Sequence, residues 1–240
     1  MDSLGTGGSQ DPLLRSAVAQ RPVVYWQRWW IVFVWAIFGI VGAFAWDMYA
    51  PISGPLTKLY GWDDDLINWL NNSNNLAVVV AAPLWAWVAD TRGMRPAALI
   101  GSVLFLCAML LNLVPLVPGF PLHWSWLPVL GSEILNGITS PLQMFAPPLI
   151  SAAWFPERER TTATALMFES NILGWMLCFI VPPALVRDGA SEEEQRRGVA
   201  YLWLSCAAGG LLFLLCVLIY FPSRPPTPPS VSARQVRFPL

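Results

Sequence analysis

Two acidic side chains stand inside stretches of the sequence that are otherwise uncharged and long enough to cross a membrane. They are Glu133 and Glu169. Carboxyl groups within a membrane are costly and usually functional, so both are candidates for proton coupling. Each has a simpler alternative that stays open. Glu133 could lie at the outer interface, and Glu169 could pair with an arginine of the inner loops, such as Arg95 or Arg158.

Four polar side chains follow Glu133 at regular spacing. Asn136, Thr139, Ser140 and Gln143 recur at i, i+3, i+4 and i+7, which places them on one face of a helix. A polar stripe within a membrane faces a cavity or a partner helix. We therefore expect Asn136, Ser140 and Gln143 to line a substrate cavity.

Two further groups of residues could belong to the same cavity. Trp46, Asp47 and Tyr49 close one apolar stretch, and aromatic rings in a cavity can hold an organic cation or stack on a flat ring. The alternatives are that the rings belong to the interfacial aromatic belt and that Asp47 reaches the outer surface. A cluster of amides opens the next stretch, and amides are expensive to place against lipid. It contains Asn71, Asn72, Asn74 and Asn75. All of these residues are predicted to face one concave surface.

These residues are carried by long uncharged stretches, and the composition agrees with such stretches. Hydrophobic residues make up 55% of the 240 residues and charged residues 12%. A helix needs about 20 apolar residues to cross the hydrocarbon core of a bilayer. The sequence predicts an all-α membrane protein with six transmembrane helices, at residues 29–50, 66–89, 97–116, 126–153, 162–186 and 199–221.

Several functions are not supported by the sequence. The 14 basic and 15 acidic residues nearly balance, which gives no support to nucleic-acid binding. The four cysteines fall within predicted helices without a CxxC pair, and His123 is the single histidine. We therefore expect no metal site, no cofactor and no enzyme activity, since no catalytic constellation is present.

The basic residues predict the orientation of the six helices. Both chain ends share one side with ten arginines, while the other side has Lys58, Arg187, Arg196 and Arg197. This asymmetry places both ends in the cytoplasm. The sequence then divides into a disordered cytoplasmic tail (1–28), the six-helix bundle (29–221) and a Pro-rich cytoplasmic linker (222–240).

The short loop between the second and third predicted helices carries a recognisable pattern. Asp90, Gly93 and Arg95 match the loop G-x-x-x-D-R-x-G-R-R of the major facilitator superfamily, which this segment resembles. Glycine allows a tight reversal between helices, and the arginine holds the loop at the cytoplasmic interface. We expect Asp90 to reach a basic group or a helix amide near the next cytoplasmic loop. Three positions depart from the pattern, namely Ala86, Thr91 and Met94.

Further motifs narrow the resemblance. Trp-Phe-Pro at positions 154–156 precedes an Arg-x-x-Ala-x-Ala opening at Arg160, and Asn-Ile-Leu-Gly follows at 171–174. This pattern is similar to solute carrier family 49, the feline leukaemia virus subgroup C receptor-related transporters, and most similar to its member 4 branch. The resemblance runs from about Tyr25 to Ser230 and covers only the N-terminal six helices of a twelve-helix family. It implies one N-terminal bundle of a major facilitator fold.

The resemblance also implies a function. Such proteins move small organic solutes by alternating access: haem, choline or ethanolamine, or pyridoxine. Trp46 and Tyr49 match an aromatic pair of choline-transporting relatives, but the glutamine near Ser140 in some of these is absent, and Gln143 could replace it one turn further in. The expected partners are the solute, the lipid bilayer, and a second six-helix bundle or another chain. A non-transporting truncated isoform or a membrane adaptor is the alternative.

The membrane in which the protein lies stays open between the lysosome and the plasma membrane. Asp11, Leu13 and Leu14 in the N-terminal tail resemble an acidic dileucine sorting motif, which is typical of lysosomal delivery. The acid lies closer to the leucines than such motifs require, so an ordinary pair of leucines is the alternative.

Overall fold

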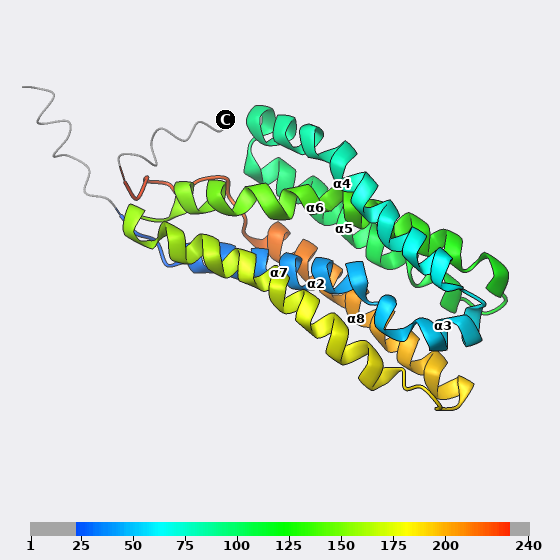
Figure 1. Ribbon diagram of the computed structural model, residues 1–240. Coiled ribbons are helices and arrows are strands. Elements are labelled where there is room, and N and C mark those ends of the chain that lie inside the picture. Colours follow the sequence, from blue (N-terminus) through cyan, green and yellow to red (C-terminus); the bar gives the residue numbers. More distant parts are fainter. Residues whose placement is uncertain (1–22, 231–240) are drawn as a thin grey trace, which may run out of the picture.

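Residues 23–230 are described by the computed structural model, and helices dominate them. Figure 1 shows the long helices packed side by side along one common direction. They are α2 (Gln27–Asp47), α4 (Asp64–Arg92), α5 (Met94–Leu111), α6 (Trp126–Trp154), α7 (Glu157–Leu185) and α8 (Glu192–Ile219). Each corresponds to one predicted transmembrane helix.

The polar ends of two helices extend beyond the predicted apolar runs. α8 begins at Glu192 because Ser191 caps it: the Ser191 hydroxyl accepts from the Glu194 amide, and the Glu194 side chain accepts from the Ser191 amide. α7 begins at Glu157, directly after Pro156, with two acids in its first turn. Acids at a helix N-terminus are favoured by the helix dipole, so these turns form without apolar residues.

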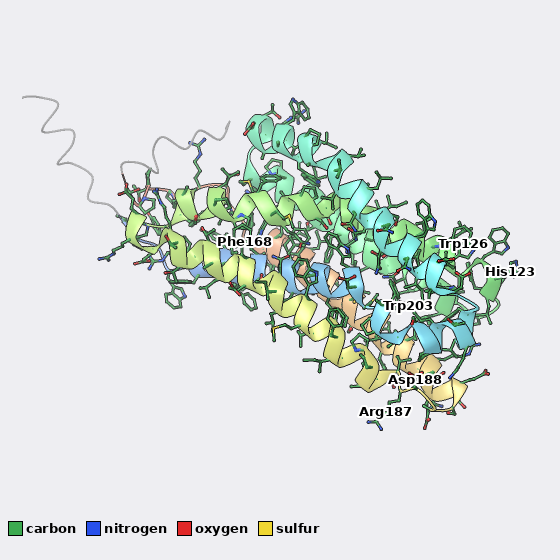
Figure 2. All side chains as sticks on the ribbon, in the orientation of Figure 1. His123, Trp126, Phe168, Arg187, Asp188 and Trp203 are labelled. Atoms are coloured by element: carbon green, nitrogen blue, oxygen red, sulfur yellow. The ribbon has the colours of Figure 1, made fainter. Side chains whose placement is uncertain are left out.

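Short helices connect the long ones at the end of the bundle that holds His123, Arg187 and Asp188 (Figure 2). One of them, α3 (Ser53–Tyr60), was not predicted from the sequence; it ends at Gly61, whose φ of 71° suits a residue without a side chain. The indole of Trp62 then donates to the Ser125 hydroxyl at 3.0 Å, which ties this loop to the start of α6. The remaining short helices are η1 (Ala50–Ile52), η2 (Val114–Leu116) and η3 (Leu122–Trp124).

Four segments of the described chain are both long and apolar enough to be candidate membrane spans. They are Gln27–Asp47, Met94–Leu116, Glu157–Leu185 and Glu192–Ile219. α4 and α6 have the length, 29 residues each, but are more polar. These two helices pack against each other, so part of their polar surface is paired inside the bundle rather than placed against lipid.

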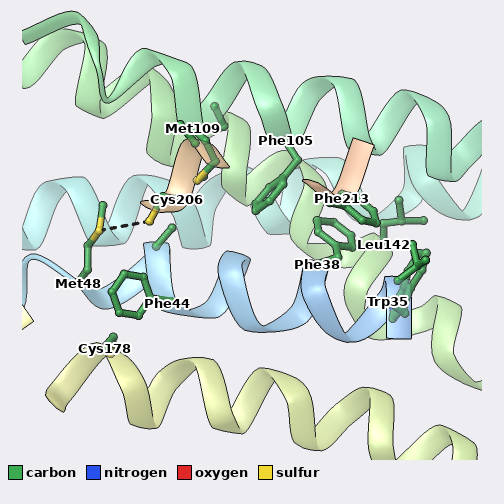
Figure 3. Close-up of a cluster of buried hydrophobic side chains, with 14 of the residues drawn as sticks. Trp35, Phe38, Phe44, Met48, Phe105, Met109, Leu142, Cys178, Cys206 and Phe213 are labelled. Atoms are coloured by element: carbon green, nitrogen blue, oxygen red, sulfur yellow. Dashed lines mark hydrogen bonds between the residues drawn. The ribbon is translucent and has the colours of Figure 1, made fainter. Parts of the chain in front are cut away.

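Aromatic rings from three helices form the centre of the bundle. Phe38 of α2 stacks on Phe213 of α8 with 4.4 Å between ring centroids, and Phe105 of α5 meets Phe38 edge to face at 5.0 Å. Figure 3 shows this cluster continuing to Trp35 on one side and to Met48 and Cys206 on the other. Such offset and edge-to-face ring contacts add to the burial of apolar area, so α2, α5 and α8 form a rigid support for the other helices.

Two glycines let helices approach closely on either side of this core. A Cβ at Gly137 of α6 would lie 2.4 Å from the Asn74 carbonyl oxygen of α4. A Cβ at Gly174 of α7 would lie 2.4 Å from the Ile40 carbonyl oxygen of α2. Small residues at membrane helix crossings allow such backbone contact, and here they set the α4–α6 and α2–α7 pairs.

The segment that follows α8 packs back onto the bundle, and we call Pro222–Ser230 the strap. The Tyr25 and Thr227 hydroxyls are 2.5 Å apart, and Nη2 of Arg160 donates to the Ser230 hydroxyl at 2.9 Å. Trp30 also donates its indole N–H to the Tyr220 carbonyl at 2.9 Å. The residues near both limits of the described chain therefore lie at one end of the bundle, as the even number of helices requires. The Asp11–Leu14 motif lies outside the described residues.

Candidate functional site

A pocket of about 360 Å³ opens between α2, α6 and α7. Its walls bring together residues from distant parts of the sequence. They are Ala43 and Trp46 of α2, Ser140, Gln143 and Met144 of α6, and Phe168, Asn171, Ile172 and Trp175 of α7. Three of the residues predicted for a substrate cavity, Trp46, Ser140 and Gln143, thus line one hollow.

Aromatic rings form one wall of this pocket. The rings of Trp46 and Trp175 meet edge to face, with 6.4 Å between their centroids and 74° between their planes. Phe168 lies two helical turns before Trp175 on α7 and is partly exposed; Figure 2 labels it. The negative faces of such rings attract cations, and their flat surfaces accept planar ligands.

Two amide side chains line the same pocket. Gln143 is 4% exposed, and its Nε2 has no hydrogen-bond partner within residues 23–230. Asn171 donates from Nδ2 to the Met167 carbonyl at 3.3 Å. Each amide lies over a glycine of α2: a Cβ at Gly42 would be 2.2 Å from Gln143 Nε2, and a Cβ at Gly39 would be 3.0 Å from Asn171 Nδ2. The two glycines leave the space that both amides occupy.

The polar stripe of α6 continues into the protein from this pocket. Asn136 is fully buried and donates from Nδ2 to the Gly42 carbonyl of α2 at 3.2 Å. The Thr139 and Ser140 hydroxyls both donate to the Asn136 carbonyl at 2.9 Å. Asn136 therefore joins α6 to α2 beneath the pocket, while Ser140 and Gln143 reach its wall.

The other predicted cavity residues lie elsewhere. Tyr49 is 1% exposed and donates its hydroxyl to Asn112 Oδ1 at 3.2 Å, in the core rather than at the pocket. Asn71 donates to Asp47 Oδ1 at 3.3 Å and links α4 to α2. Asn72 and Asn75 are exposed on α4. The expected common surface is therefore divided, because consecutive helical residues point in directions about 100° apart.

Glu133 is buried between α4 and α6. It is 1% exposed, and its Oε2 accepts a hydrogen bond from Nδ2 of Asn74 at 3.0 Å. Its position inside the bundle differs from the outer interface that the sequence left open. Asn74, the one buried amide of its cluster, was not singled out from its three neighbours because the sequence does not show which face of α4 meets α6.

Glu169 lies on the exposed side of α7. The alternative for Glu169, an ion pair with Arg95 or Arg158, is not formed within the described residues. Arg158 instead approaches Glu159 at 3.8 Å, and Glu159 also binds Arg28 at 2.9 Å. Glu169 follows Phe168, a residue of the pocket, so it stands near the pocket without lining it.

The loop between α4 and α5 forms the predicted reversal at Gly93. Its φ is 82°, in the left-handed region that glycine adopts without strain, and its amide donates to the Ala89 carbonyl at 3.1 Å. The Arg95 amide donates to the Ser223 hydroxyl at 2.9 Å, which fixes the start of the strap. The expectation for Asp90 was wrong. Asp90 is exposed and makes no ion pair or hydrogen bond in the described chain, because its neighbour Ala89 occupies the face of α4 that packs inward.

The pocket wall on α7 was not predicted as part of the site. Phe168, Asn171, Ile172 and Trp175 recur at i, i+3, i+4 and i+7, which is the spacing of one helical face. Asn171 belongs to the Asn-Ile-Leu-Gly motif at 171–174, so an amide within an apolar helix was the available indication.

Comparison with known proteins places these elements in a family. Residues 35–240 match the family model described as Major Facilitator Superfamily. The chain is 28% identical to the solute carrier family 49 member 4 homolog of Xenopus laevis, over 96% of this chain and 52% of that protein. It is 29% identical to solute carrier family 49 member A3 of Danio rerio, over 95% and 49%. It is 27% identical to the choline/ethanolamine transporter FLVCR2 of Homo sapiens, over 85% and 38%.

Solved structures show the same fold. The proton:xylose symporter XylE bound to 6-bromo-6-deoxy-D-glucose superposes with a TM-score of 0.68 at 18% identity, over 82% of this chain and 45% of that one. The inward-open conformation of the xylose transporter XylE from E. coli gives 0.64 at 17% identity, over 87% and 51%. The chain thus spans about half the length of these relatives. The resemblance to solute carrier family 49 is confirmed, and the chain belongs to the major facilitator superfamily.

Proposed function

We propose that this chain forms the N-terminal six-helix half of a secondary transporter that moves a small organic cation of the choline or ethanolamine class. The observation that carries the proposal is the pocket between α2, α6 and α7, which is lined by the paired rings of Trp46 and Trp175 and by the amide of Gln143. In transporters of this kind, the substrate site lies near the bilayer midplane between two helical bundles.

The chemistry of the pocket favours this class of solute. None of its nine wall residues is charged, so the carboxylates of a haem would have no cationic partner there. A quaternary or primary ammonium group is attracted by the indole faces. The hydroxyl of a choline or ethanolamine can in turn accept from the unpaired Nε2 of Gln143. Flat solutes such as pyridoxine could also stack on the rings, and they are the second class to be tested.

Alternating access supplies the mechanism. The α2–α7 and α4–α6 pairs are held by backbone contact at Gly174 and Gly137, and the aromatic core of α2, α5 and α8 joins them. A bundle held in this way rocks as one rigid body against a second bundle, opening the site to each side in turn. The second bundle would complete the open side of the pocket.

Uptake of labelled solutes tests the proposal. Cells that express a full-length transporter containing these six helices are given labelled choline, ethanolamine, pyridoxine or haem. We expect uptake of choline or ethanolamine above control cells, with reduced affinity after Trp46→Ala. Trp69→Ala is the matched control, because Trp69 is 69% exposed on α4 and lies outside the pocket. Uptake of pyridoxine alone would contradict the amine class, and uptake of none would favour a membrane adaptor.

A further inference from the structure

Asparagine side chains tie three helices of the bundle to one another, with one hydrogen bond for each pair of helices. Asn71 of α4 donates to Asp47 Oδ1 of α2 at 3.3 Å. Asn74 of α4 donates to Glu133 Oε2 of α6 at 3.0 Å. Asn136 of α6 donates to the carbonyl of α2 residue Gly42 at 3.2 Å. We call the five side chains of these ties the oxygen cluster: Asp47, Asn71, Asn74, Glu133 and Asn136.

The members of the oxygen cluster lie close together in the bundle. Asn71 and Asn74 are three residues apart on α4, so they share one helical face, and Glu133 and Asn136 share a face of α6 in the same way. The two helices meet there at backbone distance, as the contact of Gly137 with the Asn74 carbonyl requires. The carboxyl groups of Asp47 and Glu133 are near enough to interact electrostatically. The three ties therefore surround one site between α2, α4 and α6.

Each asparagine uses its nitrogen for the tie and leaves its oxygen without a donor. The Oδ1 atoms of Asn71, Asn74 and Asn136 are buried and have no hydrogen-bond partner within residues 23–230. In Asn74, which is 0% exposed, this oxygen shares its carbon with the nitrogen that binds Glu133, so it lies beside that carboxylate. The oxygen of Asn71 lies beside Asp47 for the same reason. Buried oxygens without a donor are costly, so they indicate a ligand that accepts electron pairs.

The oxygen cluster also contains no positive charge. Glu133 is 1% exposed, and the acids in the ion pairs found within residues 23–230 are Glu159 and Glu193. A buried carboxylate without a counter-charge is unfavourable, so Glu133 needs a proton or a cation. A proton would supply one O–H donor, which serves one of the three amide oxygens, and a water molecule would bring no charge. A metal cation neutralises the carboxylate and binds several oxygens at once.

We propose that the oxygen cluster binds a sodium ion. Carboxylate and amide oxygens are the ligands that hard cations take. In the described part of the chain, no group of three or more His, Cys, Asp or Glu side chains could hold a metal ion, which disfavours zinc and similar metals. Glu133 is the one fully buried carboxylate of the cluster, while Asp47 is half-buried at the end of α2. One buried negative charge matches a singly charged ion better than Ca²⁺.

Sodium binding can be measured without any solute, so the result does not depend on the proposed function. The purified chain in lipid nanodiscs is given radioactive sodium, and the bound label is counted in a scintillation proximity assay. We expect saturable binding that unlabelled Na⁺ displaces at lower concentration than K⁺ does, and that N-methyl-D-glucamine does not displace. Absence of saturable binding to the unaltered chain would overturn the proposal.

Glu133→Gln removes the buried charge and keeps an acceptor for Asn74, so this variant should lose saturable sodium binding. Asp65→Asn is the matched control, because Asp65 is an exposed acid in the first turn of α4 and lies outside the oxygen cluster. A ligand that binds only the folded state raises the unfolding midpoint. Na⁺ should therefore raise the midpoint of the unaltered chain and of Asp65→Asn, but not that of Glu133→Gln.

Two results with these variants would contradict the site. Sodium binding retained in Glu133→Gln would place the ion elsewhere, and an equal loss in Asp65→Asn would reduce the effect to general surface charge. Asn71→Ala is the second variant if Glu133→Gln does not fold, since Asn71 lies at the half-buried edge of the cluster. It should weaken sodium binding by about tenfold or more, as the loss of a group at a metal site does. Unchanged binding in Asn71→Ala would also overturn the proposal.

Discussion

The indole rings of Trp46 and Trp175 meet edge to face across the junction of α2 and α7, with 6.4 Å between their centroids. These residues are more than a hundred positions apart in the sequence, and only the close approach of the two helices at Gly174 brings them together. Their contact creates the aromatic wall of the pocket.

Replacing Trp175 by alanine removes half of this wall. A cation–π contact is worth about 0.5–2 kcal/mol, so the affinity for a choline-like cation should fall about two- to thirtyfold. Tryptophan fluorescence titration or uptake kinetics measures the change, and protein level should remain constant. An affinity equal to that of the unaltered protein would place Trp175 in the lipid-facing surface instead.

Replacing Gly42 by alanine displaces an amide of the pocket without disturbing the helices. The new Cβ would lie 2.2 Å from Nε2 of Gln143, at the end of a flexible side chain, so the side chain moves and the backbone does not. Loss of one hydrogen bond to the solute corresponds to about 0.5–1.5 kcal/mol, which is about a two- to tenfold weaker affinity.

Gly131→Ala is the control for this change, because its Cβ would meet only Leu111 Cδ1, at 3.2 Å. Solute affinity in Gly131→Ala should match that of the unaltered protein. Equal affinity in Gly42→Ala as well would show that Gln143 does not contact the solute.

Replacing Gly137 by alanine should destabilise the whole bundle. Its Cβ would lie 2.4 Å from the Asn74 carbonyl oxygen, and a backbone atom cannot turn aside as a side chain does. Overpacking of this kind costs about 1–3 kcal/mol. Thermal unfolding in detergent should show a lower midpoint for Gly137→Ala than for Gly131→Ala. Equal midpoints would mean that α4 and α6 can separate without loss.

Two replacements of Glu133 separate the contribution of its hydrogen bond to stability from that of its charge. In the unaltered protein, Asn74 Nδ2 donates to Glu133 Oε2 at 3.0 Å. Glu133→Gln keeps an oxygen that can accept this hydrogen bond, whereas Glu133→Ala leaves the buried donor without a partner. An unpartnered buried donor costs about 1–3 kcal/mol, so Glu133→Ala should unfold at lower temperature than Glu133→Gln.

Uptake then decides whether Glu133 couples protons. If it does, Glu133→Gln should abolish the pH dependence of uptake while leaving the protein folded, and Glu169→Gln should retain that dependence. A pH dependence unchanged in Glu133→Gln would make Glu133 a structural residue that joins α4 to α6.

The helices could be predicted from the sequence because their cause is local. A run of about 20 mostly apolar residues favours a membrane-spanning helix, and α2, α4, α5, α6, α7 and α8 each contain one of the predicted runs. Gly93 was predictable for the same reason, since a tight reversal needs a residue that tolerates positive φ. α3 was missed because it is short and depends on packing rather than on an apolar run.

The arrangement of side chains was only partly predictable, because it depends on how each helix is rotated. The spacing of Ser140 and Gln143 placed them on one face, and they do share the pocket with Trp46. Tyr49 lies only three residues after Trp46, yet it turns into the core toward Asn112. Asp90 likewise stands beside a buried residue and points outward. Neither direction can be derived from composition or spacing without the neighbouring helices.

The most direct test of the proposed solute site is photo-crosslinking with a diazirine derivative of choline. The purified protein is irradiated with the probe in the presence or absence of excess choline, and the labelled peptides are identified by mass spectrometry. Choline-sensitive labelling at Trp46 of α2 and at Phe168 and Trp175 of α7 is the predicted result, since these residues form the aromatic wall. Labelling that excess choline does not reduce, or that is confined to exposed residues of α4 such as Trp69, would contradict a solute site between α2, α6 and α7.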